Sequence, residues 1–217
     1  IYQQISSDNT YTGIIAATSV EDYVNGKIKI HEQTIAKRQE MFTEYLDSTG
    51  FNAEPVLLSY SKVPRVNEIL DLYMRERSEY EFTSTNKVLH NLWIINKQSD
   101  INEIQSLFKN VESLYIADGH HRSASSALLC ENRNSKQNTN TNKDSHNYFM
   151  SLLIDDEQMR IYDFNRLVSD LNGLSNDDFL SKVSNVYSIE KQNSVCKPHK
   201  KDEIAMYLNG TWYSLIA

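Results

Sequence analysis

Hydrophobic residues along the chain alternate between short continuous runs and a helical spacing. The continuous runs predict buried strands at residues 11–20, 55–60, 88–95, 114–117 and 148–154. Apolar residues spaced three or four positions apart predict amphipathic helices at residues 35–46, 66–73, 101–108 and 121–131. Because the predicted strands alternate with helices, we expect an α/β or α+β fold with a mixed sheet and flanking helices.

Local capping and turn residues suggest where two of these elements begin or end. Asp100 and Glu103 have the spacing of a capping box, which predicts that a helix starts beside Ser99. Asp155-Asp156-Glu157 predicts a hairpin turn that leads into a further strand at residues 159–162.

The last part of the chain carries its own turn signals. Ser175 and Asp178 are spaced to cap a short helix. Asn209-Gly210 between two apolar runs predicts a C-terminal β-hairpin, since this dipeptide favours the tightest hairpin turns. We expect residues 175–217 to form a smaller C-terminal subdomain.

Residues 132–147 differ from the rest of the chain because they contain no apolar residue and many asparagines. This composition predicts a flexible, solvated, Asn-rich loop. The loop is either a linker without a role of its own or a lid over a site.

Composition and charge narrow the classes of function. The 22 lysines and arginines against 29 aspartates and glutamates give a net charge of −7, which argues against a nucleic-acid partner. No apolar stretch reaches the roughly 20 residues that a membrane helix needs, so no membrane partner is expected.

The start of the chain and its cysteines suggest a cellular context. Ile1-Tyr2-Gln3-Gln4 has neither an initiator methionine nor the features of a signal peptide, so we expect a piece of a longer polypeptide. Two cysteines, Cys130 and Cys196, are too few for a disulfide framework or a thiolate metal site. A cytoplasmic location fits these features best.

The segment Asp118-Gly119-His120-His121-Arg122 combines chemically active residues where an apolar strand gives way to a helix. Gly119 permits a tight turn and a close approach of a ligand to the backbone. The first N–H groups of the helix and the fork of Arg122 suit phosphate or carboxylate oxygens. His120 and His121 can donate to phosphate, bind metal or exchange protons, and Asp118 can hold Mg²⁺ or accept a proton.

Weaker candidates stay open beside this segment. His31 and Glu32 precede a predicted helix, where they are either site residues or ordinary helix-start residues. Glu54 is either a ligand or a surface carboxylate, and Arg166 is either a second anion ligand or one half of a surface ion pair. His90, in an apolar strand, is typical of a hydrogen-bonded core histidine. Together the spacing of these residues follows no recognised zinc pattern.

Residues 115–122 resemble the signature of the bacterial domain-of-unknown-function family numbered 1015. Further blocks resemble that family in order and kind at residues 13–23, 28–34, 54–56, 90–93 and 165–168. Members usually begin about a hundred residues earlier, so the resemblance implies that 1–217 is a fragment of a larger family domain. Ser123 stands where the family often has an aromatic residue.

The Gly-X-X-Arg core also resembles, more distantly, the phosphate-binding turn of the ParB and sulfiredoxin superfamily, which includes a free serine kinase. This resemblance implies a ParB/sulfiredoxin-like core and a nucleotide-dependent kinase of a small metabolite such as serine, using ATP or ADP with Mg²⁺. It implies that Gly119, His120, His121, Arg122 and Arg166 bind the cofactor.

Catalytic roles would fall to Asp118, His120, His121, Arg122, Glu32 and His31, with Asp118 as the Mg²⁺ ligand. The alternative is a non-catalytic module that senses a nucleotide. A ParB-like DNA-binding protein is least favoured because the chain is acidic.

Overall fold

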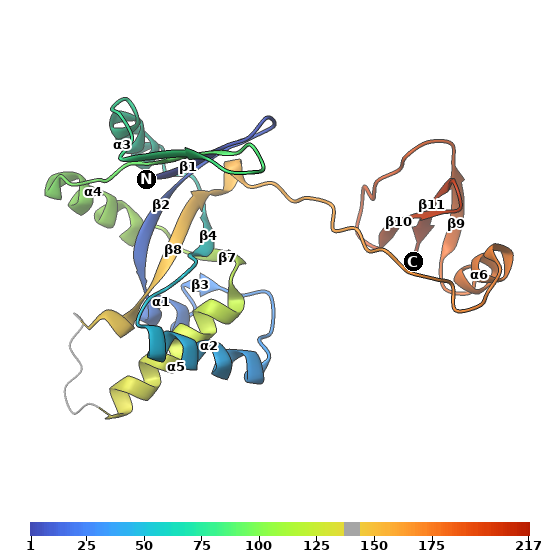
Figure 1. The fold of residues 1–217 in the computed structure, drawn as a ribbon, viewed down its shortest axis with the longest axis horizontal. Coiled ribbons are helices and arrows are strands. Elements are labelled where there is room, and N and C mark those ends of the chain that lie inside the picture. The colour runs from blue at the N-terminus through green and yellow to red at the C-terminus, as the bar shows by residue number, and fades with distance from the viewer. Residues whose placement is uncertain (137–143) are drawn as a thin grey trace. The chain divides into compact units, whose positions relative to one another are not determined.

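The computed structural model of the protein describes residues 1–136 and 144–217, with the side chains of the first range described up to Ser135. These residues form two compact units, Ile1–Ile161 and Tyr162–Ala217 (Figure 1). The central part of the predicted Asn-rich loop, residues 137–143, lies outside the described residues.

The first unit contains one eight-stranded sheet in the order β3-β7-β4-β8-β2-β1-β6-β5. Its strands are β1 (Tyr2–Ile5), β2 (Thr10–Ser19), β3 (Ile28–Lys29), β4 (Val56–Tyr60), β5 (Tyr80–Thr83), β6 (Leu89–Leu92), β7 (Leu114–Asp118) and β8 (Tyr148–Asp155). Its α-helices are α1 (Val20–Val24), α2 (Ala36–Thr49), α3 (Pro64–Met74), α4 (Gln98–Lys109) and α5 (His120–Lys136). Short 3₁₀ turns flank β8 at Ser145–Asn147 and Asp156–Gln158. The mixed α/β architecture predicted from the sequence is confirmed.

The long strand β2 joins the two halves of this sheet. It pairs with β1 over Thr10–Gly13 and with β8 over Ile14–Ser19, antiparallel in both cases. At Gly13, where one partner replaces the other, an added Cβ would lie 2.6 Å from the carbonyl oxygen of Leu153. Only a glycine permits β8 to come this close.

Parallel and antiparallel pairs alternate on the other side of the sheet. β4 runs parallel to β8 and antiparallel to β7, and β3 runs parallel to β7. These pairings bring the segments after β3, before β4 and after β7 to one edge of the sheet.

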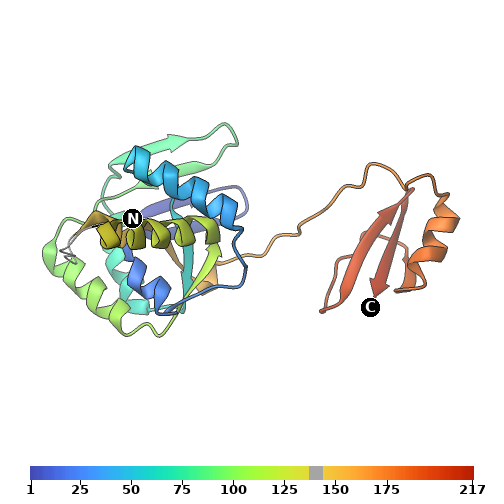
Figure 2. The same cartoon turned by 90° about the horizontal axis from the view of Figure 1, so that it is seen from below.

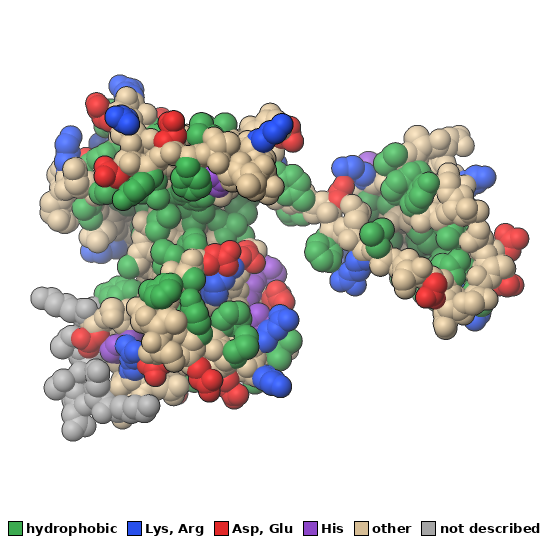
Figure 3. Space-filling model, viewed as in Figure 1, with side chains coloured by type: hydrophobic (Ala, Val, Ile, Leu, Met, Phe, Trp, Pro, Cys, Tyr) green, Lys and Arg blue, Asp and Glu red, His purple; other side chains and the backbone are tan. Residues whose placement is uncertain are grey.

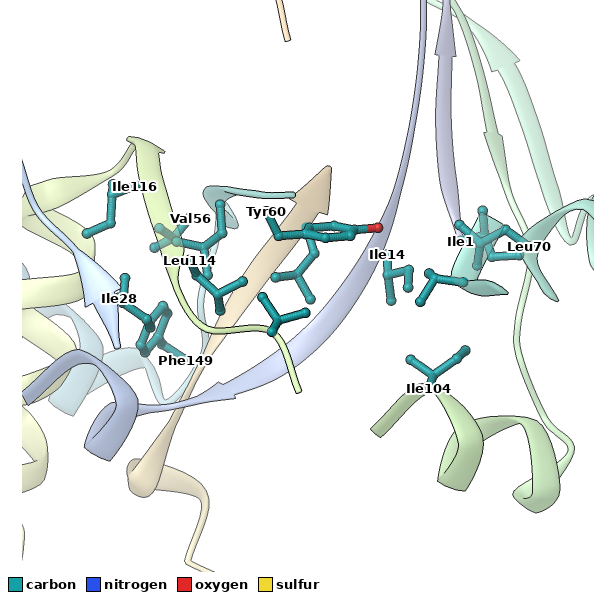
Figure 4. Packing of buried hydrophobic residues seen from close by; sticks show 14 of the residues in the cluster. Ile1, Ile14, Ile28, Val56, Tyr60, Leu70, Ile104, Leu114, Ile116 and Phe149 are labelled. Carbon is teal, nitrogen blue, oxygen red and sulfur yellow. The ribbon is translucent and has the colours of Figure 1, made fainter. Parts of the chain in front are cut away.

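The hydrophobic core lies between the sheet and its helices. Figure 4 shows Ile28, Leu114 and Phe149 near one end of the core, and Leu70 with Ile104 near the other. All five side chains are buried, and they come from three strands and two helices. Among the described residues, no helix is both long enough and apolar enough to span a bilayer.

The second unit is a three-stranded antiparallel sheet with one helix beside it (Figure 2). It comprises α6 (Asn176–Val183), β9 (Ser188–Gln192), β10 (Glu203–Leu208) and β11 (Thr211–Ile216). The C-terminal hairpin is confirmed, with Asn209 at φ 44° and Gly210 at φ 81°. The helix cap is confirmed too, because Ser175 Oγ accepts the N–H of Asp178 over 3.1 Å.

The helix predicted beside Ser99 is present, but the predicted capping box is wrong because tertiary contacts engage its two acidic residues. α4 begins at Gln98, and no side chain caps it. Asp100 instead accepts from the Tyr73 hydroxyl over 2.8 Å, and Glu103 pairs with Arg65 at 2.6 Å. The acidic residues that resemble a capping box therefore connect α4 to α3.

Three further boundaries differ from the prediction. Residues 132–136 continue α5 rather than starting a loop, and residues 145–147 form a 3₁₀ turn. After Asp155 the chain makes a second 3₁₀ turn, and residues 159–162 form no strand. The strand predicted at 88–95 is shorter, Leu89–Leu92.

Replacing Gly13 with alanine should destabilise the first unit by about 1–3 kcal/mol, because β2 or β8 must shift to admit the new methyl group. Urea denaturation followed by circular dichroism measures this change. Ala17→Ser, at an exposed position of the same strand, is the matched control and should change stability by less than about 0.5 kcal/mol. Equal stability of the two variants would contradict the close approach at Gly13.

Candidate functional site

The turn between β7 and α5 is built on Gly119. Asp118 ends β7, and α5 begins at His120. Gly119 has φ 101°, in a region that residues with a side chain rarely adopt. An added Cβ there would also lie 3.3 Å from Arg122 Cζ and 3.3 Å from each γ carbon of Val56. The predicted tight turn from strand to helix is confirmed.

The start of α5 carries backbone N–H groups that have no partner inside the helix. The N–H of Ser123 donates to the carbonyl of Gly119 over 3.0 Å, which makes it the first donor of the helical ladder. The N–H groups of residues 120–122 precede this bond and lie at the positive end of the helix dipole. Such groups favour the binding of anionic oxygen.

The guanidinium of Arg122 is surrounded by three acceptors. It donates to the carbonyl of Pro55 and to the carboxylate of Asp118, and its Nη2 lies 3.3 Å from Oε2 of Glu54. The Arg122 side chain is 23% exposed, whereas those of Asp118 and Glu54 are 69% and 72% exposed. The cluster carries an excess of negative charge, so an anion reaches Arg122 only by sharing or displacing these acceptors.

His120 is the buried imidazole of the site. Its Nε2 accepts the backbone N–H of His31 over 3.4 Å, and its Nδ1 lies 3.8 Å from Oε2 of Glu32. Burial lowers the pKa of His120 below the ordinary histidine value, and His31 lowers it further, whereas Glu32 and Asp118 act in the opposite direction. The fold therefore favours the neutral form of the His120 imidazole.

His31 and Glu32 reach the site because β3, which precedes them, pairs with β7. Both residues are exposed. The rings of His31 and His120 meet edge to face, with their centroids 4.4 Å apart. Figure 3 shows acidic, basic and histidine side chains together on the surface near the end of β7. The structure thus brings His31 and Glu32 to the Asp-Gly-His-His-Arg segment.

Polar side chains hold the first part of α5 against α2. Thr43 Oγ1 lies 3.2 Å from the carbonyl of Ser125, and Ser125 Oγ lies 3.1 Å from the carbonyl of Gln39, although each hydroxyl is closer still to a carbonyl of its own helix. Gln39 Nε2 also donates to the carbonyl of Ala124 over 3.2 Å. Ser125 is completely buried. These bonds between the two helices fix the position of the α5 N-terminus.

His121 differs from His120 in its hydrogen bonding. Its Nδ1 is buried and has no hydrogen-bond partner among the residues that the structure describes. Buried polar atoms in proteins are nearly always paired, so this nitrogen has hydrogen-bonding capacity that the fold itself does not use.

The other candidates lie outside this arrangement. Arg166 belongs to the second unit, where its guanidinium lies 5.7 Å from the ring centroid of Phe164. His90 lies on β6, bonds the Tyr2 hydroxyl over 2.7 Å and stacks on the exposed ring of Phe82. It is hydrogen-bonded as predicted but half-buried, so it is not a core residue. Within residues 1–136 and 144–217, no three or more histidine, cysteine or acidic side chains gather as a metal-binding group.

Sequence reasoning undervalued Glu54, which the structure brings next to Arg122. The carbonyl of Pro55, the other neighbour of Arg122, carries no sequence signal at all. Glu54 immediately precedes β4, and β4 is the neighbour of β7 in the sheet. The strand order, which the sequence pattern does not reveal, would have identified both residues.

Comparison with known protein families places the chain in one of them. The family described as "Protein of unknown function (DUF1015)" matches residues 1–217, so the chain belongs to this family. No curated protein and no solved structure matches the chain. The more distant resemblance to the ParB and sulfiredoxin superfamily stays a prediction from the motif.

The buried position of His120 predicts a titration midpoint below the ordinary value of about 6.5. Since the unfolded chain then binds a proton more readily than the folded one, His120 contributes stability above pH 6.5 that is lost as the pH falls towards its own pKa. Titration of the histidine NMR signals measures the midpoint. A His120 midpoint at or above 6.5 would contradict the burial described here.

Proposed function

We propose that this member of the DUF1015 family binds a magnesium–nucleotide complex, ATP or ADP, at the start of α5 and transfers a phosphoryl group to a small metabolite. The observation that supports this most directly is the junction itself. The N–H groups of residues 120–122 lie at the positive end of α5, in the same turn as the guanidinium of Arg122, which pairs with two carboxylates. Helix N-termini after a glycine turn commonly hold phosphate in proteins.

The charge of the cluster favours a phosphate that carries a cation over a bare phosphate. Asp118 and Glu54 outnumber Arg122, and both carboxylates are mostly exposed. Carboxylate oxygens together with nucleotide phosphates and waters are the ligands that Mg²⁺ takes in enzymes of this type. Asp118 and Glu54 would hold the cation, which frees Arg122 to neutralise the charge of the transferred group.

Glu32 fits the role of general base better than Asp118 does. Asp118 is already bonded to Arg122, whereas the mostly exposed carboxylate of Glu32 has only the imidazole of His120 beside it. In the transfer, the acceptor hydroxyl oxygen bonds to the terminal phosphorus of the nucleotide, and the bond from that phosphorus to its bridging oxygen breaks, so that ATP leaves as ADP or ADP leaves as AMP. The hydroxyl proton passes to Glu32.

Calorimetric titration of the protein with ATP or ADP tests the binding step. We expect binding in Mg²⁺ that weakens in EDTA, and a loss of about 10–100-fold in affinity in Arg122→Ala, because a charged hydrogen-bonding group is removed. Arg133→Ala is the matched control, since Arg133 lies on the same helix but pairs with Asp47. Unchanged affinity in Arg122→Ala would refute the role of Arg122.

A transfer assay with labelled ATP and a panel of hydroxyl-bearing metabolites, serine among them, tests the chemical step. We expect labelled product with at least one acceptor and a fall of about 100-fold in its rate in Glu32→Gln, because the proton acceptor is lost. Nucleotide that binds but is recovered unchanged would instead favour a non-catalytic nucleotide sensor.

A further inference from the structure

We propose that the imidazole of His120 is a positioning residue that holds Glu32 at the site, and that it does not itself contact the nucleotide or the acceptor. This inference rests on the proposed function, because it concerns the residue that acts there as general base. A buried histidine beside a carboxylate usually suggests a catalytic dyad. The contacts of both ring nitrogens argue against that interpretation.

The hydrogen bond from His31 fixes the tautomer of His120. A backbone N–H can only donate, so Nε2 of His120, 3.4 Å from the nitrogen of His31, carries no proton. In a neutral imidazole the single proton must then lie on Nδ1. Nδ1 is the atom that lies 3.8 Å from Oε2 of Glu32, so a polar N–H lies beside the carboxylate.

Burial separates the roles of the two side chains. His120 is 5% exposed and Glu32 is 65% exposed, so a ligand at the surface reaches Glu32 but not the ring nitrogens of His120. The ring of His31, packed edge to face against His120, covers it further. His120 therefore acts through its neighbours.

The segment that carries Glu32 needs a contact with a rigid element to fix its position. Residues 30–35 lie between β3 and α2 and belong to neither helix nor strand, so few backbone bonds fix them. His120 is held at the first position of α5 by the helix itself. Its bond to the His31 amide connects this irregular segment to the rigid start of the helix.

The tautomer is measured directly by long-range ¹H–¹⁵N NMR on the full chain labelled at histidine. We expect His120 as the Nδ1–H form with an unprotonated Nε2, although histidines in water favour the Nε2–H form. Loss of the signal in His120→Gln assigns it. A predominantly Nε2–H form of His120 would overturn the proposal.

Two replacements of His120 test the contact of its Nε2 atom separately from that of its Nδ1 atom. The amide of glutamine reaches the Nε2 position and can accept the His31 N–H, whereas the shorter asparagine reaches only the Nδ1 position. We expect the His31 amide to be protected from hydrogen exchange in wild type and in His120→Gln, and to exchange at least tenfold faster in His120→Asn. His90→Gln, at the histidine of β6, is the matched control. Equal exchange in both His120 variants would overturn the proposal.

Turnover of MgATP shows whether His120 acts through Glu32. We expect His120→Asn to lower kcat by about as much as Glu32→Gln, with KM for MgATP changed less than threefold, and His120→Gln to recover most of the rate. The double variant His120→Asn/Glu32→Gln should be no slower than Glu32→Gln alone, because coupled residues are not additive. Additive losses would overturn the proposal. If neither the wild type nor any variant turns over MgATP or MgADP, the proposed function fails. The tautomer and the exchange rates then still show whether His120 makes the contact with the His31 amide.

Discussion

The left-handed turn at Gly119 is the constraint on which the site depends. It ends β7 and starts α5 within a single residue, so the last side chain of the strand and the first turn of the helix lie next to each other. Arg122 then reaches back to the carbonyl of Pro55 and connects the helix to the segment that leads into β4. Because β3 and β4 both flank β7, the turn becomes the meeting point of three chain segments. A longer connection would leave the helix N-terminus away from the carboxylates.

Periodicity predicts the fold best where tertiary contacts agree with it. α3 follows its apolar positions Val66, Ile69 and Leu70, all of which are buried. The short strands β1 and β5 escape prediction because polar residues interrupt them and neighbouring strands stabilise them. The polar C-terminal end of α5 is also missed by the sequence pattern, because a tertiary contact stabilises it. Asn134 bonds His146 over 2.7 Å, a contact between residues twelve positions apart that no local pattern indicates.

In the candidate site, too, the sequence predicts what is set by neighbouring residues but not what is set by the packing of distant segments. The residues of the Asp-Gly-His-His-Arg segment are contiguous, and the turn that unites them follows from one glycine, so the sequence alone predicts their proximity. Which imidazole is buried does not follow from it, since His120 and His121 are adjacent and differ only in their surroundings. The two neighbours of Arg122 that precede β4 depend on strand order, which only the folded chain defines.

The contact between α2 and α5 sets a size limit at the site. Gln39, Thr43 and Ser125 join the helices through hydroxyl and amide groups, and Ser125 has no exposed surface. The small side chains of Thr43 and Ser125 permit the two helices to approach closely, and this close packing leaves little room for an added atom. Substitutions on this face of α5 are therefore limited by the volume of the new side chain as well as by its polarity. The spacing between the helices in turn fixes how far the first turn of α5 stands from the end of β7.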